Sequence, residues 1–243
     1  MSEINVYPRH KLVENLLELY PPQPINRFLP DWYKKQKVNN KEDFYFKDKA
    51  IQAKRCPAII EEVTRGIVIP SWTDFFIYKK GDVINWVAEV GRRPELDHIK
   101  WITEQGEDQI EHMKLNGINS YGILKLTSPY LFKAPKGYGI HFKDPFYHHR
   151  RNIRLLSGYV ESDIWYETNF PFEFYKDINV TEEESLVIKA GDPLIVMELY
   201  KKDQKHEVKV NKYDEEFIDL HTKQAQHLYS MSEDWNRYTK FYK

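Results

Sequence analysis

The stretch ILKLTSPYLFKAPKGYGIHF, residues 123–142, decides the fold of this chain. Three short runs rich in apolar and aromatic residues, 123–126, 130–133 and 138–142, alternate with turn-forming segments. The segments are SP at 128–129 and APKG at 134–137; proline cannot donate to a strand ladder, and glycine accepts the positive φ of a turn. The stretch therefore predicts three consecutive short β-strands.

The same pattern continues on both sides of this stretch. Downstream, further strands are predicted over residues 153–159, 164–166, 186–188 and 194–200. Upstream, the KKGD turn at 79–82 joins two predicted strands into a hairpin, 75–78 and 83–88. Many short strands spaced about ten residues apart are typical of a sandwich, jelly roll or barrel. We expect a mainly β, jelly-roll or cupin-like sandwich over residues 56–211.

The two ends of the chain have a different pattern from the middle. Residues 1–55 contain five prolines and predict an irregular N-terminal arm with one short helix over 11–19. Residues 212–243 predict a C-terminal helical extension, because Phe217, Leu220 and Leu228 recur at helical spacing. No internal repeat or linker divides the chain, so we expect one domain overall with two terminal extensions.

Composition excludes several classes of partner. The 243 residues include 36 basic and 37 acidic side chains, a net charge of -1. Such a balance provides no field that draws nucleic acid or an anionic membrane, so we expect neither. Cys56 is the only cysteine, which indicates a reducing compartment. No signal peptide or membrane span is recognisable. We expect a soluble cytoplasmic protein whose candidate contacts are a protein partner or a second copy.

Five stretches between residues 54 and 194 carry a family resemblance. They are KRCP at 54–57, GIVIPSWTD at 66–74, SPYLFKAPKGY at 128–138, GYVESD at 158–163 and KAGDPL at 189–194. In these stretches the chain resembles an uncharacterised family of marine tailed-phage and bacterial proteins. The resemblance implies a compact, jelly-roll-like β domain of phage origin, which would act in the host cytoplasm, and no known reaction. The chain departs from the family pattern at MELY, residues 197–200.

A first candidate site is a metal site built from His141, Asp144 and His148, with His149 beside it. A non-haem iron centre in a jelly roll needs two imidazoles and one carboxylate on one side of Fe(II) or another divalent metal. His141 and Asp144 are three residues apart, however, and side chains on a strand alternate with period two. The alternative interpretation is a polar strand end followed by a solvated basic loop.

A second candidate is a ligand site around Glu161 and Asp163. These carboxylates lie two residues apart, so on a strand they would share one face, close to Trp165. Paired carboxylates can act as general acid and base or bind a hard cation, and with aromatic rings they can bind sugar. Tyr138 and Arg154 are further candidate ligand contacts. The alternative interpretation is an outward polar strand face.

Two hypotheses for function follow. The first is a phage-type β-sandwich protein that acts by binding or assembly. The second is a non-haem iron oxygenase of the 2-oxoglutarate type, or another metal-dependent cupin-type enzyme.

No phosphate-binding loop, dinucleotide fingerprint or nucleophile elbow occurs in the sequence. His221 and His227 are six apart, a poor spacing for one metal on a helix.

Overall fold

A computed structural model describes most of the chain. The described residues are 3–36, 56–80, 83–89, 96, 99–104, 120–145, 148, 153–175, 186–204 and 207–230. The chain divides into two compact units. The first unit comprises Met1–Asp31 with Glu61–Asp203, and the second comprises Trp32–Ile60 with Gln204–Lys243.

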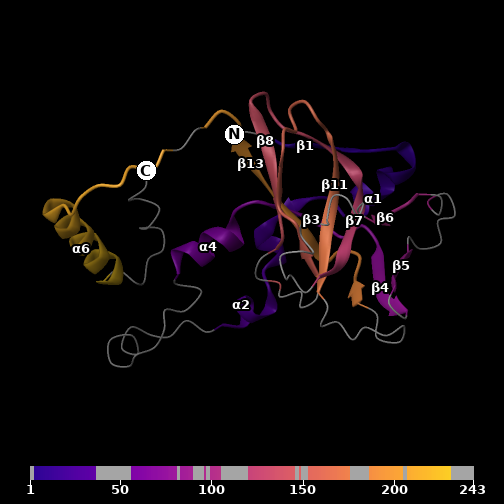
Figure 1. The fold of residues 1–243 in the computed structure, drawn as a ribbon, viewed down its shortest axis with the longest axis horizontal. Coiled ribbons are helices and arrows are strands. Elements are labelled where there is room, and N and C mark those ends of the chain that lie inside the picture. The colour runs from indigo at the N-terminus through magenta and orange to yellow at the C-terminus, as the bar shows by residue number, and fades with distance from the viewer. Residues whose placement is uncertain are drawn as a thin grey trace. The chain divides into compact units, whose positions relative to one another are not determined.

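The first unit contains three antiparallel sheets (Figure 1). One sheet has the order β1-β7-β11-β9, with β6 also paired to β7. Its strands are β1 (Asn5–Pro8), β6 (Ile102–Glu104), β7 (Ser120–Lys133), β9 (Ile153–Leu155) and β11 (Glu167–Tyr175). The second sheet has the order β10-β8-β13-β3-β2. Its strands are β2 (Gln23–Pro24), β3 (Ile67–Pro70), β8 (Tyr138–Lys143), β10 (Gly158–Val160) and β13 (Pro193–Lys201).

A third sheet and several short helices complete the described elements. The sheet has the order β12-β4-β5, with β4 (Asp74–Lys80), β5 (Val83–Glu89) and β12 (Leu186–Ile188). The helices are η1 (Lys11–Val13), α1 (Glu14–Leu19), η2 (Ile25–Phe28), α2 (Asp31–Lys35), α4 (Pro57–Thr64) and α6 (Glu215–Ser230). Among the described residues, no helix is both long and apolar enough to cross a bilayer.

All three sheets contribute to one buried core filled with aromatic rings. Trp72 contacts Phe75 and Tyr130 edge-on, with ring centroids 5.7 and 6.2 Å apart, and Phe170 contacts Phe132 in the same way at 6.3 Å. Edge-to-face pairs of this kind are favoured over face-to-face stacking. These buried aromatic rings therefore pack the sheets together.

The N-terminal helical segment is fastened to this core through Tyr130. Its hydroxyl lies 3.1 Å from the carbonyl oxygen of Leu16 and 3.3 Å from that of Tyr20, so it can donate to either. Burial raises the pKa of Tyr130 far above its usual value, which keeps the hydroxyl protonated as a donor. Within this segment Leu16 is buried, whereas Leu19 is exposed.

The prediction of a mainly β chain with short helices is confirmed, and so is a helix near the C-terminus, over Glu215–Ser230. The predicted turn at 134–137 is also confirmed, with Gly137 at φ +80°. The finer assignment to the jelly-roll class stays a prediction. Residues 231–243 and most of 95–118 lie outside the described residues.

Three predicted strand assignments are wrong. The strand predicted over 153–159 is two strands in different sheets, β9 and β10. The predicted break at Ser128-Pro129 lies inside the continuous strand β7, because a register shift in the pairing with β11 accommodates the proline. The Ser128 hydroxyl also accepts from the Tyr130 amide at 3.0 Å. Residues 164–166, predicted as a strand, instead belong to the connection between β10 and β11.

Candidate binding surface

The end of β10 and the connection from it to β11 carry a dense group of exposed apolar side chains. Within residues 159–166, hereafter the aromatic loop, exposed fractions reach 68% for Tyr159, 69% for Ile164, 63% for Trp165 and 41% for Tyr166. Single exposed apolar residues are common on protein surfaces, whereas a group of large ones marks a contact site. We therefore take the aromatic loop as the candidate functional surface.

Hydrogen bonds hold the backbone of the aromatic loop in its middle and at its C-terminal end. Within the loop, the amides of Ile164 and Trp165 both donate to the carbonyl oxygen of Glu161 at 3.0 Å. The loop also bonds to the end of β7 and to the residue after it: the Phe132 amide donates to the carbonyl oxygen of Tyr166 at 2.9 Å, and the Ala134 amide donates to that of Ser162 at 2.9 Å. The exposed side chains thus project from a fixed backbone.

An ion-paired cluster fixes the polar side of the loop. The Lys202 ammonium lies 2.9 Å from a Glu161 carboxylate oxygen and 3.0 Å from one of Asp163. The second Asp163 oxygen accepts from the Gly137 amide at 3.0 Å. The hydrogen bond from Lys202, followed by that from Gly137, lowers the pKa of Asp163, and the bonds to Glu161 and Asp163 raise the pKa of Lys202 to about 12.

Two neighbouring rings, those of His141 and Tyr200, pack against the Tyr159 ring. The His141 imidazole stacks on the Tyr159 ring, with centroids 4.2 Å apart and an interplanar angle of 9°. Tyr200 meets Tyr159 edge-on at 5.0 Å. The Tyr200 ring covers Gly139 so closely that a Cβ at that position would lie 2.5 Å from it. A side chain at this position, near the start of β8, would displace the Tyr200 ring, whereas glycine leaves room for it.

The charged groups beside His141 shift the pKa of its imidazole in opposite directions. Burial is the largest influence and lowers the pKa of His141, and the nearby Lys143 ammonium adds to this effect. The carboxylates of Glu198 and Glu62 oppose it. The neutral imidazole is therefore favoured as the stacking partner of Tyr159.

The structure does not gather the three residues of the predicted metal site. His141 stacks on Tyr159, whereas the Asp144 carboxylate accepts from the Leu155 amide at 3.1 Å. His148 lines a hollow beside η2. In the described ranges, no group of three His, Cys, Asp or Glu side chains is placed to hold a metal ion. His149 lies outside the described residues.

The predicted ligand site is brought together in part. Glu161, Asp163 and Trp165 all lie in the aromatic loop, but the two carboxylates are bound to Lys202 in a turn and do not line a strand face. Tyr138 is half-buried at the start of β8, and its side chain packs against the core.

Arg154 lies apart from this group, on β9 in the other five-stranded sheet. Its guanidinium pairs with the Glu173 carboxylate of β11 at 2.8 Å, directly across the ladder. The Glu173 side chain is only 1% exposed, so Arg154 balances a buried charge. Its role in the described structure is to compensate that carboxylate.

Sequence reasoning missed Tyr159, Tyr200 and Lys202 as parts of this surface. The run GYVESDIWY at 158–166 held a usable signal, because large apolar residues alternate there with residues typical of turns. Lys202 gave no local signal, since it meets Glu161 only through the pairings of β10 with β8 and of β8 with β13.

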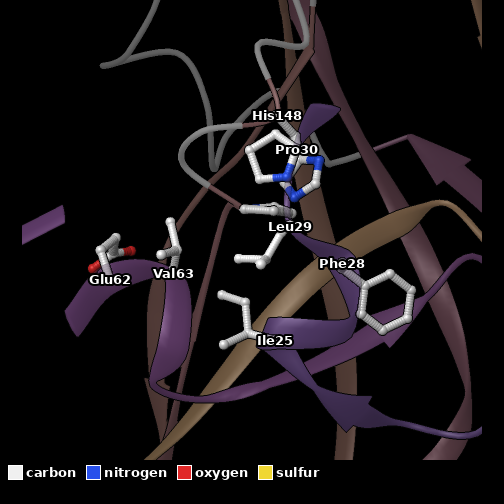
Figure 2. A pocket seen from close by; sticks show the side chains of 8 residues that line it. Ile25, Phe28, Leu29, Pro30, Glu62, Val63 and His148 are labelled. Carbon is white, nitrogen blue, oxygen red and sulfur yellow. The ribbon is translucent and has the colours of Figure 1, made fainter. Parts of the chain in front are cut away.

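A small apolar hollow lies elsewhere on the same unit (Figure 2). Its empty space is about 260 Å³, part of it open solvent. The lining residues are Ile25, Phe28, Leu29, Pro30, Glu62, Val63, Pro145 and His148. In Figure 2 the side chains of Ile25, Leu29 and Val63 converge on one space, while Glu62 lies at its margin. Beside it, Lys143 pairs with Glu62 at 2.8 Å and with Glu198 at 3.3 Å.

Comparison with known proteins yields only distant structural likenesses. No protein-family model and no curated protein matches the sequence. Two structures of the dUTPase from phage phi11 of S. aureus, one of a mutant, are 9% and 10% identical, each over 40% of this chain and 82% of that chain, with TM-scores of 0.27 and 0.26. A mutant dUTPase of Staphylococcus bacteriophage 80alpha with dUpNHpp is 9% identical over 87% of this chain and 90% of that chain, with a TM-score of 0.34. Scores this low assign neither a family nor an activity.

Proposed function

We propose that this protein acts by binding or assembly, with the aromatic loop as its contact surface and another protein chain as its partner. One observation carries the proposal: four large apolar side chains, Tyr159, Ile164, Trp165 and Tyr166, are exposed within eight residues. Tryptophan and tyrosine contribute most of the binding energy at protein interfaces. Exposing them together costs solubility unless a partner covers them.

The fixed geometry of the loop supports the same proposal. Asp163 is tied to the Gly137 amide and to Lys202, and the Tyr159 ring is stacked on His141. A surface that is ordered before binding loses little conformational entropy when a partner arrives. The loop therefore has the properties of a preformed contact surface.

The proposal also includes the class of protein, its fold and the place where it acts. The resemblance over residues 54–194 favours a phage-type β-sandwich protein of jelly-roll-like fold, working in the host cytoplasm. The near-neutral charge of the chain favours a protein partner over nucleic acid or an anionic membrane.

Affinity capture from the cells that produce the protein tests the proposal. The wild type is compared with Trp165→Ser and with the control Leu19→Ser, which removes an apolar side chain that is 56% exposed on the same unit. We expect proteins recovered with the wild type and with Leu19→Ser to be lost with Trp165→Ser. Recovery of the same proteins at equal yield with all three variants would contradict the proposal.

The alternative, a non-haem iron or other metal-dependent cupin-type enzyme, stays a prediction. Metal analysis of the purified protein separates the two hypotheses. Near-stoichiometric iron, manganese or zinc would favour the enzyme and contradict a role in binding alone, because such a metal content requires a built ligand set.

A further inference from the structure

Among the described edge strands of the two five-stranded sheets, β10 differs from the others because its sequence does not protect it from pairing. Natural edge strands are shielded from unwanted pairing by prolines, charged side chains or bulges. β1 and β2 end in Pro8 and Pro24. β6 contains Glu104, and β9 contains Arg154. β10, Gly158–Val160, has neither a proline nor a charge. Its free edge therefore suits the addition of another strand.

The backbone of Tyr159 directs its hydrogen-bonding groups toward that free edge. In an antiparallel ladder, the amide and carbonyl of one residue point to one neighbouring strand, and those of the next residue point to the opposite side. The Lys202 amide donates to the Gly137 carbonyl at 3.0 Å. In steps of two from that bond along the β8–β13 register, His141 also bonds to β13. Tyr159 lies opposite His141 on the other side of β8, so its own amide and carbonyl point away from β8.

The side chain of Tyr159 has one covered ring face and one open ring face. The His141 imidazole covers the first, with centroids 4.2 Å apart and an interplanar angle of 9°. This stack runs from β8 to β10, in the direction in which the strands follow one another, so the open face looks beyond the edge of the sheet. Tyr159 is 68% exposed, and a Cβ at Gly158 would meet nothing within 4 Å. The edge therefore has room for an approaching strand with a ring of its own.

We propose that two copies of this chain join through their β10 strands, which pair antiparallel about a twofold axis with Tyr159 of one copy opposite Tyr159 of the other. This inference rests on the proposed function and identifies the partner chain as a second copy. Because Tyr159 directs both an amide and a carbonyl outward, it is complementary to itself, and each amide donates to the carbonyl of the other copy. The two five-stranded sheets become one continuous sheet, with a row of four rings, His141 and Tyr159 of each copy, across it.

The residues that follow β10 are compatible with this pairing. Glu161 comes directly after β10, and its carboxylate is already bound to the Lys202 ammonium at 2.9 Å, so it brings no uncompensated charge to the axis. Two strands of three residues make a small interface. The exposed side chains of Ile164 and Trp165, a few residues further along the aromatic loop, extend it with apolar area. The association of the two copies therefore depends on concentration.

Analytical ultracentrifugation of the full chain over a dilution series tests the inference. Tyr159→Pro removes the outward amide and the ring but no hydrogen bond to β8, and proline is tolerated where the amide of an edge strand faces solvent. The control is Tyr7→Lys, which alters a tyrosine that is 50% exposed on the edge strand β1. Circular dichroism verifies that each variant is folded. We expect wild type and control to form dimers, and Tyr159→Pro to weaken dimerisation by about 30-fold or more.

A pair of charge variants gives the sharpest result and does not depend on the folding of the proline variant. Tyr159→Lys and Tyr159→Glu each place like charges opposite one another at the axis, so each alone should stay monomeric, whereas their mixture should form a heterodimer. The inference is overturned if the wild type stays monomeric up to about 1 mM, if folded Tyr159→Pro dimerises like the wild type, or if the mixture associates no better than either charge variant alone. In each of these cases the capture experiment with Trp165→Ser still decides the proposed function independently.

Discussion

Two tryptophans of the same unit show how differently this chain uses its aromatic residues. Trp72 is 1% exposed and packs edge-on against Phe75 and Tyr130, whereas Trp165 is 63% exposed on the aromatic loop. The first contributes to folding by leaving water, and the second remains available for a partner. A high aromatic content by itself does not separate these two uses, because both require large apolar rings.

Two lysines make a parallel contrast. Each lies between two carboxylates: Lys143 between Glu62 and Glu198, and Lys202 between Glu161 and Asp163. Lys143 joins α4 to the sheet, so it holds separate elements together. Lys202 holds a surface loop, so it positions exposed rings. The predictions below separate the residues that hold the fold from those that present the loop.

The largest effect is expected at the buried tryptophan. Trp72→Ala should lower the free energy of unfolding by about 3–5 kcal/mol, because it leaves a large cavity in the core. The indole nitrogen of Trp72 has no hydrogen-bond partner among the described atoms. The matched variant Trp72→Phe therefore loses no hydrogen bond to that nitrogen and should cost clearly less than alanine. Urea denaturation measures both, and equal losses for the two variants would be inconsistent with a cavity effect.

The next effect concerns Lys143. Lys143→Met leaves the carboxylates of Glu62 and Glu198 without their shared ammonium, and should cost about 1–2 kcal/mol. The value is moderate because these side chains are 30% and 22% exposed, so water screens the charges. Lys189→Met is the control: its pair with Asp74 is more exposed, and its loss should cost less than about 1 kcal/mol. An equal loss of unfolding free energy in Lys143→Met and Lys189→Met would show that Lys143 contributes no more to stability than an exposed ion pair.

A smaller effect is expected at Lys202, seen as a change in titration. The pKa of Asp163 is lowered in the folded chain, so its contribution to stability is present above the unfolded pKa and is lost as the pH falls through the folded pKa. Lys202→Met removes the largest cause, and the pKa of Asp163 should rise while the Gly137 bond remains. Carboxyl NMR follows the titration; an unchanged pKa would show that Lys202 does not hold Asp163.

The smallest effect on stability is expected at the exposed tryptophan. Trp165→Ser should change the free energy of unfolding by no more than about 0.5 kcal/mol, because the side chain is largely in water in the folded state. Binding or self-association should nevertheless fall sharply. Thermal melting and ultracentrifugation of one preparation measure both quantities, and a loss of more than about 2 kcal/mol in stability would place Trp165 among the core residues.

The fold class was predictable because most strands have a recognisable pattern in their own short stretch of sequence. Apolar runs, prolines and glycines around 123–142 predict three strands, and two of their boundaries hold. The break at Ser128-Pro129 was not predictable, since β11 accommodates the proline by shifting its register. A strand partner far along the chain therefore overrode a local signal.

The sequence predicted which residues of the candidate site lie close together along the chain, but not how they are arranged in space. Glu161, Asp163 and Trp165 were identified because they lie close in sequence. The ammonium that pairs with both carboxylates belongs to Lys202, which lies 39 residues beyond Asp163. His141 and Asp144 lie in one short segment, but one stacks on Tyr159 and the other binds the Leu155 amide.

By itself the sequence determined that this chain forms many short strands, a hairpin among them, and a helix near the C-terminus. Periodicity and turn chemistry act between near neighbours, so they can be recognised without coordinates. The tertiary structure alone decided which aromatic rings are buried, that Lys202 fixes the loop, and that a hollow lies at the other end of the β8–β13 pair. These features depend on contacts between residues distant in sequence, and such contacts exist only once the sheets have formed.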